Sequence, residues 1–431
     1  MAGTAAVGLV AVFAVDLINL LYISMLGDKA LTAAIGFAGV VTFFHTSINI
    51  GLMIGITATV ARTVGAGRMD DARRLSTHSL IGITTISAVL ALATVLGLGP
   101  LLAVLGARGE AAVQAQRFLS ISLLGLPLAG LGMASSALLR SVGDARRAMT
   151  VQLSAAAVTT ALDPLFIFVF GLGLDGAALV SLIARAALAA AGLHGAWRVR
   201  RLLGPPVSAR WSSDAAQIGK VAGPAVLTNL ATPVGNAFVT HSMAAFGAAA
   251  MTGQATIDRI TPVAFGLIYA LSGAVGPILA QNLGARQFGR VREGLRASVW
   301  FMLSAVSAAW LLLFLLQGLL LRLFSLDGVS AQMLQWFCNG LCASFFFAGA
   351  LFVANASFNN LGRPLWSTGF NWGRATLGTI PFVWWGAHYG PIGVMVGQAA
   401  GVVLFGSLAI FTAFAMARSM GQIGDKRGHK P

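Results

Sequence analysis

The stretch WFMLSAVSAAWLLLFLLQGLLL, from Trp300 to Leu321, decides the fold class because it carries no charged residue. A helix needs about 20 mainly apolar residues to cross the hydrocarbon core of a bilayer. The runs Ile81–Leu105 and Ile392–Ala417 also lack charge throughout. The sequence therefore predicts an all-α integral membrane protein.

Composition supports many spans joined by short loops. Of the 431 residues, 57% are hydrophobic and only 10% are charged, whereas soluble domains carry about 25% charged residues. The first Lys or Arg is Lys29, so the start resembles a mature span rather than a signal peptide. We predict twelve spans, at residues 4–26, 31–63, 79–105, 113–138, 148–170, 177–198, 217–245, 249–281, 297–321, 331–358, 367–386 and 392–417.

Basic residues alternate between the two sides of these spans. Loops after even-numbered spans and the tail hold 20 of the 28 Lys and Arg residues, whereas loops after odd-numbered spans hold only Lys29, Arg108 and Arg322. Cytoplasmic loops carry the excess of Lys and Arg. We therefore expect a multi-pass protein of a bacterial cytoplasmic (inner) membrane, with both termini in the cytoplasm. The net charge of +15 then reflects orientation, and we expect no nucleic-acid partner.

An internal repeat divides the chain into two halves. Residues 137–143 read ALLRSVG and residues 356–362 read ASFNNLG, 219 positions later. Gly65-Ala66 recurs as Gly284-Ala285 at the same spacing. We predict an N-terminal six-helix bundle (1–200), a cytoplasmic linker (201–216), a C-terminal six-helix bundle (217–418) and a basic tail (419–431), with the bundles in parallel orientation.

Small residues in these helices indicate close packing. Gly393, Gly397 and Gly401 form overlapping GxxxG motifs, which let helices approach closely in lipid. The two cysteines, Cys338 and Cys342, lie one helical turn apart in an apolar stretch. Two thiols alone make neither a disulfide framework nor a metal site, so we interpret them as packing residues.

Three of the 13 acids are expected inside the membrane: Asp16, Asp163 and Asp258. An acid in hydrocarbon is a functional candidate by default. Asp16 and Asp163 are predicted about 12–15 Å below the outer boundary, from a rise of 1.5 Å per residue, and Asn19 lies one turn after Asp16. The alternative is a solvated acid near a helix end or a structural hydrogen bond.

The surroundings of Asp163 favour ion binding. Thr159 and Thr160 precede it by one turn, and Pro164 follows it. Proline lacks an N–H group and disturbs the preceding turn, which frees the Thr160 carbonyl. A carboxylate, two hydroxyls and a carbonyl could bind a proton or Na⁺, and a change of occupancy at Asp163 could bend the helix at Pro164.

The sequence offers little support for enzymatic or metal chemistry. Asp258 and Arg259 could form ion pairs across helices or contact a substrate. The sequence has no GxxxxGK[ST] motif for ATP and no zinc-type motif, so we expect neither an enzyme nor a cofactor or metal beyond the coupling ion. A membrane-embedded transferase would need a clustered His/Asp or paired-acid motif, and a channel would not explain the duplication.

Several motifs together resemble the MATE (multidrug and toxic compound extrusion) transporters. LRSVGD at 139–144 is similar to the LRGxGD turn of that family. Leu162-Asp163-Pro164, followed by Gly176-Ala177-Ala178, is similar to its LDP helix and GAA helix entry. The resemblance extends over nearly the whole chain and is sharper in the first half.

This resemblance implies two six-helix bundles in a V, alternating access, and export of small cationic, amphipathic compounds in exchange for H⁺ or Na⁺. In the DinF-like branch the key acids correspond to Asp16 and Asp163, and Ser181 matches a nearby hydroxyl position. Thr159 replaces an Asn of the family, which favours H⁺ over Na⁺. We expect a monomer. The alternative is a flippase or exporter of a lipid-linked or anionic metabolite in the same superfamily.

Overall fold

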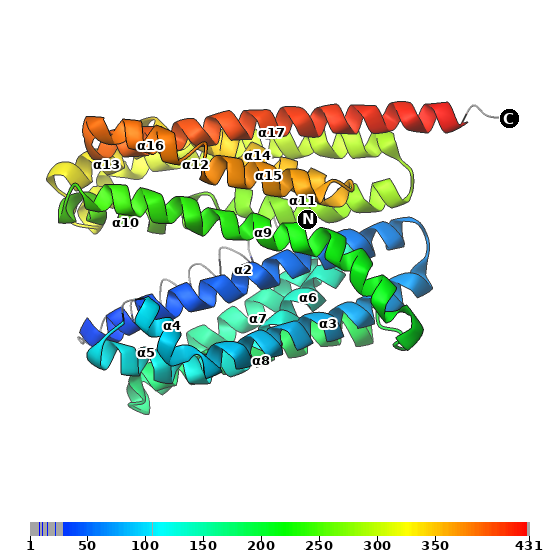
Figure 1. The fold of residues 1–431 in the computed structure, drawn as a ribbon, viewed down its shortest axis with the longest axis horizontal. Helices are drawn as coiled ribbons and strands as arrows, with labels where there is room; N and C mark the ends of the chain where they lie inside the picture. Colours follow the sequence, from blue (N-terminus) through cyan, green and yellow to red (C-terminus); the bar gives the residue numbers. More distant parts are fainter. Residues whose placement is uncertain are drawn as a thin grey trace. The chain divides into compact units, whose positions relative to one another are not determined.

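The computed structural model describes Gly8, Ala11, Val15 and Tyr22, and then residues 29–105 and 107–428. Within these residues every regular element is a helix. The chain divides into two compact units, with the boundary between Val226 and Leu227. Each unit is a bundle of helices lying side by side (Figure 1). The predicted all-α fold class is confirmed.

The first unit contains long helices interrupted by short 3₁₀ and π segments. The predicted spans from 31–63 to 177–198 fall on helices. The third is interrupted at Gly97, and the fifth and sixth end in π segments. The helices are α2 (Lys29–Gly65), α3 (Met69–Leu96), α4 (Leu98–Val104), α5 (Gly109–Ser122), η1 (Leu123–Gly125), α6 (Leu126–Ser141), α7 (Ala145–Pro164), η2 (Leu165–Val169), α8 (Gly173–Leu193), η3 (His194–Val199) and η4 (Ser208–Arg210).

The second unit begins within α9 (Trp211–Ala244), which crosses the boundary between the units. The predicted span 249–281 breaks at Phe265 into two helices, α10 and α11. The elements after α9 are α10 (Ala248–Ala264), α11 (Gly266–Gly284), α12 (Phe288–Leu323), α13 (Gly328–Asn339), η5 (Leu341–Ala343), α14 (Ser344–Asn360), α15 (Pro364–Ala375), α16 (Ile380–Gly386), η6 (Ala387–Tyr389) and α17 (Gly390–Gly428).

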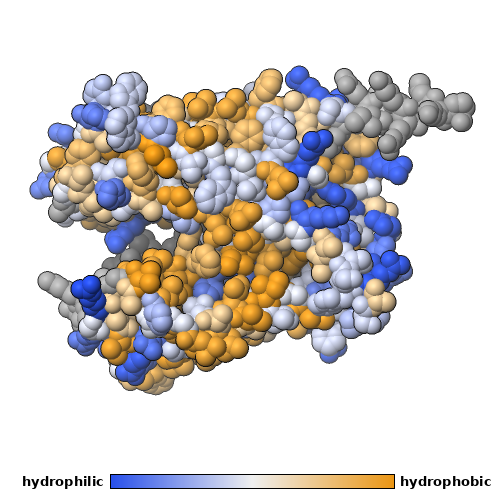
Figure 2. Space-filling view, in the orientation of Figure 1, coloured by the Kyte–Doolittle hydropathy of each residue, from blue (hydrophilic) through white to orange (hydrophobic). Residues whose placement is uncertain are grey.

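Helix α12 shows how these helices face lipid. Its side chains Leu311, Leu315 and Leu319 are 59%, 67% and 60% exposed, while Met302 and Val306 are buried. Apolar surface is thus presented outward as well as inward, which is the mark of a helix in a bilayer. Figure 2 shows apolar residues along the helices and hydrophilic residues gathered at their ends. By length and composition, nine helices in the described part could cross a membrane.

The sequence repeat is visible in the backbone. Residues with a left-handed φ in the first half recur 219 positions later in the second half. Such a φ suits glycine, which has no Cβ. The φ angles are 58°, 83° and 65° at Gly109, Gly143 and Gly171, and 47°, 92° and 81° at Gly328, Gly362 and Gly390. The two halves therefore share their turns as well as their sequence pattern.

The small residues pack as predicted. A Cβ atom at Gly397 or Gly401 of α17 would collide with the carbonyl of Phe382 or Gly378. The last helix can therefore lie this close to the chain before and within α16 only because it carries glycines there. Cys338 and Cys342 are both free and buried, which confirms their interpretation as packing residues.

The segment that leads into α9 is bonded to one face of α3. The Thr77 hydroxyl donates to the Gly204 carbonyl at 2.7 Å and accepts from the Gly204 N–H at 3.1 Å. The Val207 N–H donates to Nε2 of His78 at 3.1 Å. These contacts hold the polar segment after η3 against the N-terminal part of α3.

Asp214 fixes the start of α9. Its carboxylate is 3% exposed and accepts a hydrogen bond from Nε of Arg74 at 3.0 Å. Nδ1 of His78 lies 2.8 Å from the same carboxylate, and the His78 and Trp211 rings are 4.8 Å apart. An acid in the first turn also stabilises a helix N-terminus. These contacts explain why α9 begins at Trp211, before the predicted start of the seventh span at residue 217.

Candidate functional site

Asp163 lies near the end of α7 and is 1% exposed. Its Oδ1 atom has no hydrogen-bond partner among the residues that the structure describes. A buried polar atom without a partner costs about 1–3 kcal/mol. An ionisable group within a membrane helix is a functional-site candidate by default, so the structure leaves Asp163 as a candidate.

Helix geometry changes at the residue after Asp163. The α-helix ends at Pro164 and continues as the π-helix η2. The Phe170 N–H donates to the Leu165 carbonyl at 2.9 Å, five residues back. Proline supplies no N–H to the α-helical ladder, and π segments occur often at functional sites. The disturbance expected at Pro164 thus takes the form of a wider helical turn directly after the acid.

The predicted hydroxyl groups bond within their own helices. Thr159 and Thr160 donate to the carbonyls of Ala155 and Ala156 at 3.1 Å and 2.9 Å. Ser181 of α8 donates to the Ala178 carbonyl at 2.8 Å. Their hydrogens are used, so these oxygens can only accept hydrogen bonds or coordinate a cation. The structure gives none of them a hydrogen bond to Asp163.

Asp16 and Asn19 lie outside the described residues. Two described residues of the same predicted span contact the helix that carries Asp163. A Cβ atom at Gly8 would lie 3.3 Å from Cβ of Gln152 in α7. The ring of Tyr22 meets the ring of Phe168 in η2 edge-on, with centroids 5.7 Å apart.

Asp258 and Arg259 lie on α10 in the second unit, and both side chains are exposed. Oδ1 of Asp258 accepts a hydrogen bond from Nε2 of Gln254 at 2.9 Å. Within the described residues neither Asp258 nor Arg259 makes an ion pair. Both side chains are therefore open to a partner that the described residues do not supply.

Arg374 of α15 is a further candidate for substrate contact. It lies within the predicted span 367–386, but its position in the sequence alone suggested no role. Its Nη2 donates to the Thr232 hydroxyl of α9 at 3.2 Å, while its buried Nε has no partner in the described chain. Tyr269 of α11 interacts electrostatically with both Arg374 and Asp258. The sequence signal for this candidate is a lone arginine in an apolar helix.

Metal binding has no visible site in the described residues. No group of three or more His, Cys, Asp and Glu side chains lies close enough together there to hold a metal ion. The chemistry available is that of single charged groups in apolar surroundings, which suits the binding and release of ions and small molecules.

The MatE family model matches residues 5–165 and, a second time, residues 224–385. The chain belongs to the MatE family. The two matches begin 219 residues apart, at the spacing of the sequence repeat, so each half of this MatE protein carries one copy of the family unit.

Curated relatives include members with different cargoes. The FAD transporter of Shewanella oneidensis is 28% identical over 394 residues, 89% of this chain and 86% of that protein. The multidrug export protein MepA of Staphylococcus aureus is 22% identical over 355 residues, 80% and 77% of the two chains. An uncharacterized 21 kDa protein of Pseudomonas savastanoi is 40% identical over 200 residues, 44% of this chain but only 63% of that one.

Solved structures agree with this assignment. The crystal structure of a mutant of the MATE transporter VcmN from Vibrio cholerae matches with a TM-score of 0.92 and 25% identity, covering 97% of this chain and 96% of that one. The two relatives with a named function and the VcmN structure are transporters. This MatE chain is therefore a membrane transporter of small molecules and not an enzyme.

Proposed function

We propose that the protein is a secondary antiporter that exports small amphipathic compounds in exchange for H⁺ by alternating access. The observation that carries the proposal is Asp163, an acid with a buried, unpartnered oxygen beside the α-to-π change at Pro164. Gain or loss of a proton there changes the charge next to a deformable turn. Ion occupancy and helix shape are thereby coupled.

The coupling site extends to the first span in this proposal. Asp16 and Asn19 lie between Gly8 and Tyr22 in the sequence. The contacts of those two described residues with α7 and η2 support a shared site with Asp163. A pair of acids in helices one and five is the pattern of the DinF-like branch. Thr159 offers one hydroxyl where an amide would add a carbonyl ligand, so H⁺ is favoured over Na⁺.

The cargo is proposed to be cationic and amphipathic. Asp258 is exposed and unpaired by any cation in the described chain, so it is available to a positively charged compound. The relation to the multidrug export protein MepA supports this class of cargo. The protein is proposed to act as a monomer in the cytoplasmic membrane.

Transport by reconstituted protein tests the coupling. In proteoliposomes, an imposed pH gradient drives accumulation of a fluorescent lipophilic cation by the wild type, and Asp163→Asn reduces it to the level of empty liposomes while the protein still folds. The matched control is Asp175→Asn, which removes an acid of α8 paired with Arg117 at 2.6 Å and is expected to keep transport. Gradient-driven accumulation by the Asp163→Asn protein at the wild-type level would reject the proposal.

A second candidate is the export of an anionic metabolite, and Arg374 is the observation that favours it. Its Nε has no partner in the described chain, and guanidinium groups bind carboxylate and phosphate well. The relation to an FAD transporter, over 89% of this chain, points the same way.

Competition between cargoes separates the two candidates. A lipophilic cation and FAD, both fluorescent, are presented to the same proteoliposomes, and Arg374→Gln is compared with Asp258→Asn. Cation export lost in Asp258→Asn and kept in Arg374→Gln supports the cationic cargo. FAD export lost in Arg374→Gln and kept in Asp258→Asn supports the anionic one.

A further inference from the structure

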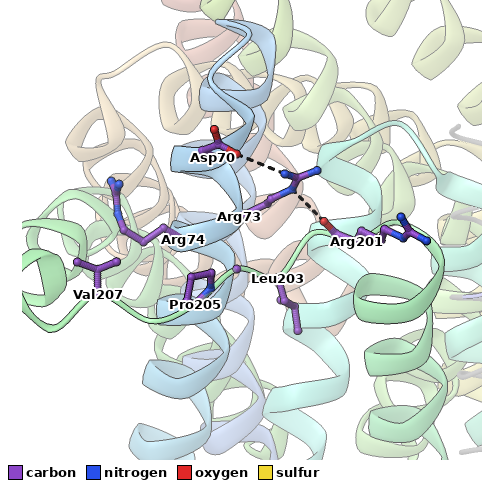
Figure 3. A pocket seen from close by; sticks show the side chains of 8 residues that line it. Asp70, Arg73, Arg74, Arg201, Leu203, Pro205 and Val207 are labelled. Atoms are coloured by element: carbon purple, nitrogen blue, oxygen red, sulfur yellow. Dashed lines mark hydrogen bonds and ion pairs between the residues drawn. The ribbon is translucent and has the colours of Figure 1, made fainter.

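A cleft of about 630 Å³ opens at the end of the first unit where the basic loops gather. Its walls are the first turns of α3 and the segment between η3 and η4 (Figure 3). The residues that matter are Asp70, Arg73 and Arg74 on one side and Arg201, Pro205 and Val207 on the other.

The arginines of the cleft differ in how far they are neutralised. Arg74 is bonded to Asp71 and Asp214. Arg73 donates from Nε to the Arg201 carbonyl at 3.2 Å and from Nη1 to Asp70 at 3.3 Å. The Asp70 side chain is fully exposed, and such a surface pair is weak and easily replaced.

Arg201 is the free cation of this cleft. Its backbone has a φ of 49°, and Figure 3 shows its side chain extending away from Asp70. Its guanidinium makes no hydrogen bond or ion pair in the described part of the chain. The neighbouring Arg200 is bonded to Asp144 and Arg198 lies over the Trp197 ring, so Arg201 alone in this run is left for a ligand.

Several side chains place the cleft at the level of the membrane interface. Trp197 and Trp211 are 52% and 39% exposed on either side of the segment, and tryptophan collects at headgroup depth. Val207 and Pro205 give the cleft an apolar wall. Anionic lipids are drawn to basic pockets on the cytoplasmic side of membrane proteins, and the positive-inside pattern assigns this end to that side.

We propose that the cleft binds the phosphate of an anionic phospholipid headgroup, with the Arg201 and Arg73 guanidiniums as its contacts. The phosphate replaces Asp70 as the partner of Arg73, and the glycerol end of the lipid lies along Pro205 and Val207. The bound lipid then joins the segment before α9 to α3, and it stabilises the first unit without taking part in transport chemistry.

Thermal unfolding of the intact protein in a neutral detergent tests this site. Phosphatidylglycerol, phosphatidylcholine and inorganic phosphate are titrated separately, and each midpoint shift is converted into an affinity. Phosphatidylglycerol alone is expected to raise the midpoint. Arg201→Gln should weaken its binding about fivefold, the equivalent of about 1 kcal/mol for one interfacial arginine, whereas Arg210→Gln, an exposed arginine outside the cleft, should not.

Asp70→Asn should change lipid affinity in the opposite direction, because it frees Arg73 from its ion pair and removes a negative charge from the cleft. It should tighten phosphatidylglycerol binding. Equal losses of phosphatidylglycerol affinity in Arg201→Gln and Arg210→Gln would show that the lipid responds to the overall positive charge and not to a specific site. Inorganic phosphate or phosphatidylcholine acting as well as phosphatidylglycerol, or unchanged binding in Asp70→Asn, would overturn the proposal.

Discussion

Asp144 joins two helix ends through a single buried carboxylate. It is the N-cap of α7, where its side chain accepts the Arg147 N–H at 3.2 Å. Its Oδ2 also accepts hydrogen bonds from the Arg147 and Arg200 guanidiniums, both at 2.6 Å. Burial raises the pKa of Asp144, but the hydrogen bonds from Arg147 and Arg200 outweigh it and lower the pKa below its ordinary value. One side chain thus fixes the start of α7 and the chain after η3.

Replacing Asp144 by Asn should destabilise the protein by about 1–3 kcal/mol at neutral pH, because a cap and two charge-assisted hydrogen bonds are weakened. An acid with a lowered folded-state pKa contributes its stability above the unfolded pKa, about 3.9, and loses it as pH falls through the folded value. Melting curves from pH 7 to pH 3 should therefore show the wild type and variant converging below about pH 4. A constant difference across that range would contradict this role.

Among single residues, the sequence singled out Asp163 as a candidate but gave Arg374 no role. An acid within an apolar run stands out from composition alone, and the proline after it adds a second signal. Arg374 is just as unusual in a span, but its meaning depends on Thr232 and Tyr269, which lie on other helices. Such neighbours are set by three-dimensional packing and have no trace in local sequence.

At the scale of elements, close packing at the glycines of α17 leaves no room for a larger side chain at those positions. Gly401→Ala places a Cβ against the Gly378 carbonyl, and overpacking of this kind costs about 1–3 kcal/mol. Gly318→Ala in α12 meets nothing within 4 Å and should be neutral or slightly stabilising. Unfolding in detergent should rank Gly318→Ala with the wild type and Gly401→Ala clearly below it. Equal stability of the two variants would refute the packing argument.

The start of α9 should loosen when Asp214 is replaced by Asn. The carboxylate is buried between Arg74 and His78, so the change leaves two polar partners with weaker bonds. Hydrogen exchange at the amides of Gly204 and Val207 should become about tenfold faster or more, as expected for a local loss of about 1.4 kcal/mol. Asp70→Asn is the control, because Asp70 is fully exposed. If exchange is unchanged in Asp214→Asn, the hydrogen bonds with Thr77 and His78 are enough to hold the segment before α9 in place.

Helix positions follow from the sequence more closely than helix interruptions do. Apolar length fixes where each span lies, which is why the described spans match from residue 31 onward. The break at Phe265, the π-helices η2 and η3 and the early start of α9 depend on hydrogen bonds and packing. Pro164 indicated a disturbance near η2, and Pro262 precedes the break at Phe265. Whether each disturbance is a π-helix or a break could be seen only in the structure.

For the whole chain, the sequence repeat predicts one orientation for both halves, because six predicted spans separate equivalent positions. The recurrence of left-handed turns at Gly109 and Gly328, and at Gly143 and Gly362, ties each half to the same pattern of loops. The basic excess predicts a cytoplasmic position for the turns at Gly143 and Gly362 and the opposite side for those at Gly109 and Gly328.

Cysteine accessibility in intact cells measures this orientation directly. The natural thiols Cys338 and Cys342 are 0% exposed, so they give little background with a membrane-impermeant maleimide. Ser208→Cys, in the exposed segment before α9, should be labelled only after the cells are permeabilised. Asp327→Cys, at the exposed turn before α13, should be labelled in intact cells, and its side chain makes no capping hydrogen bond that the change would remove. The reverse pattern would place the basic loops outside the cell and would contradict the predicted orientation.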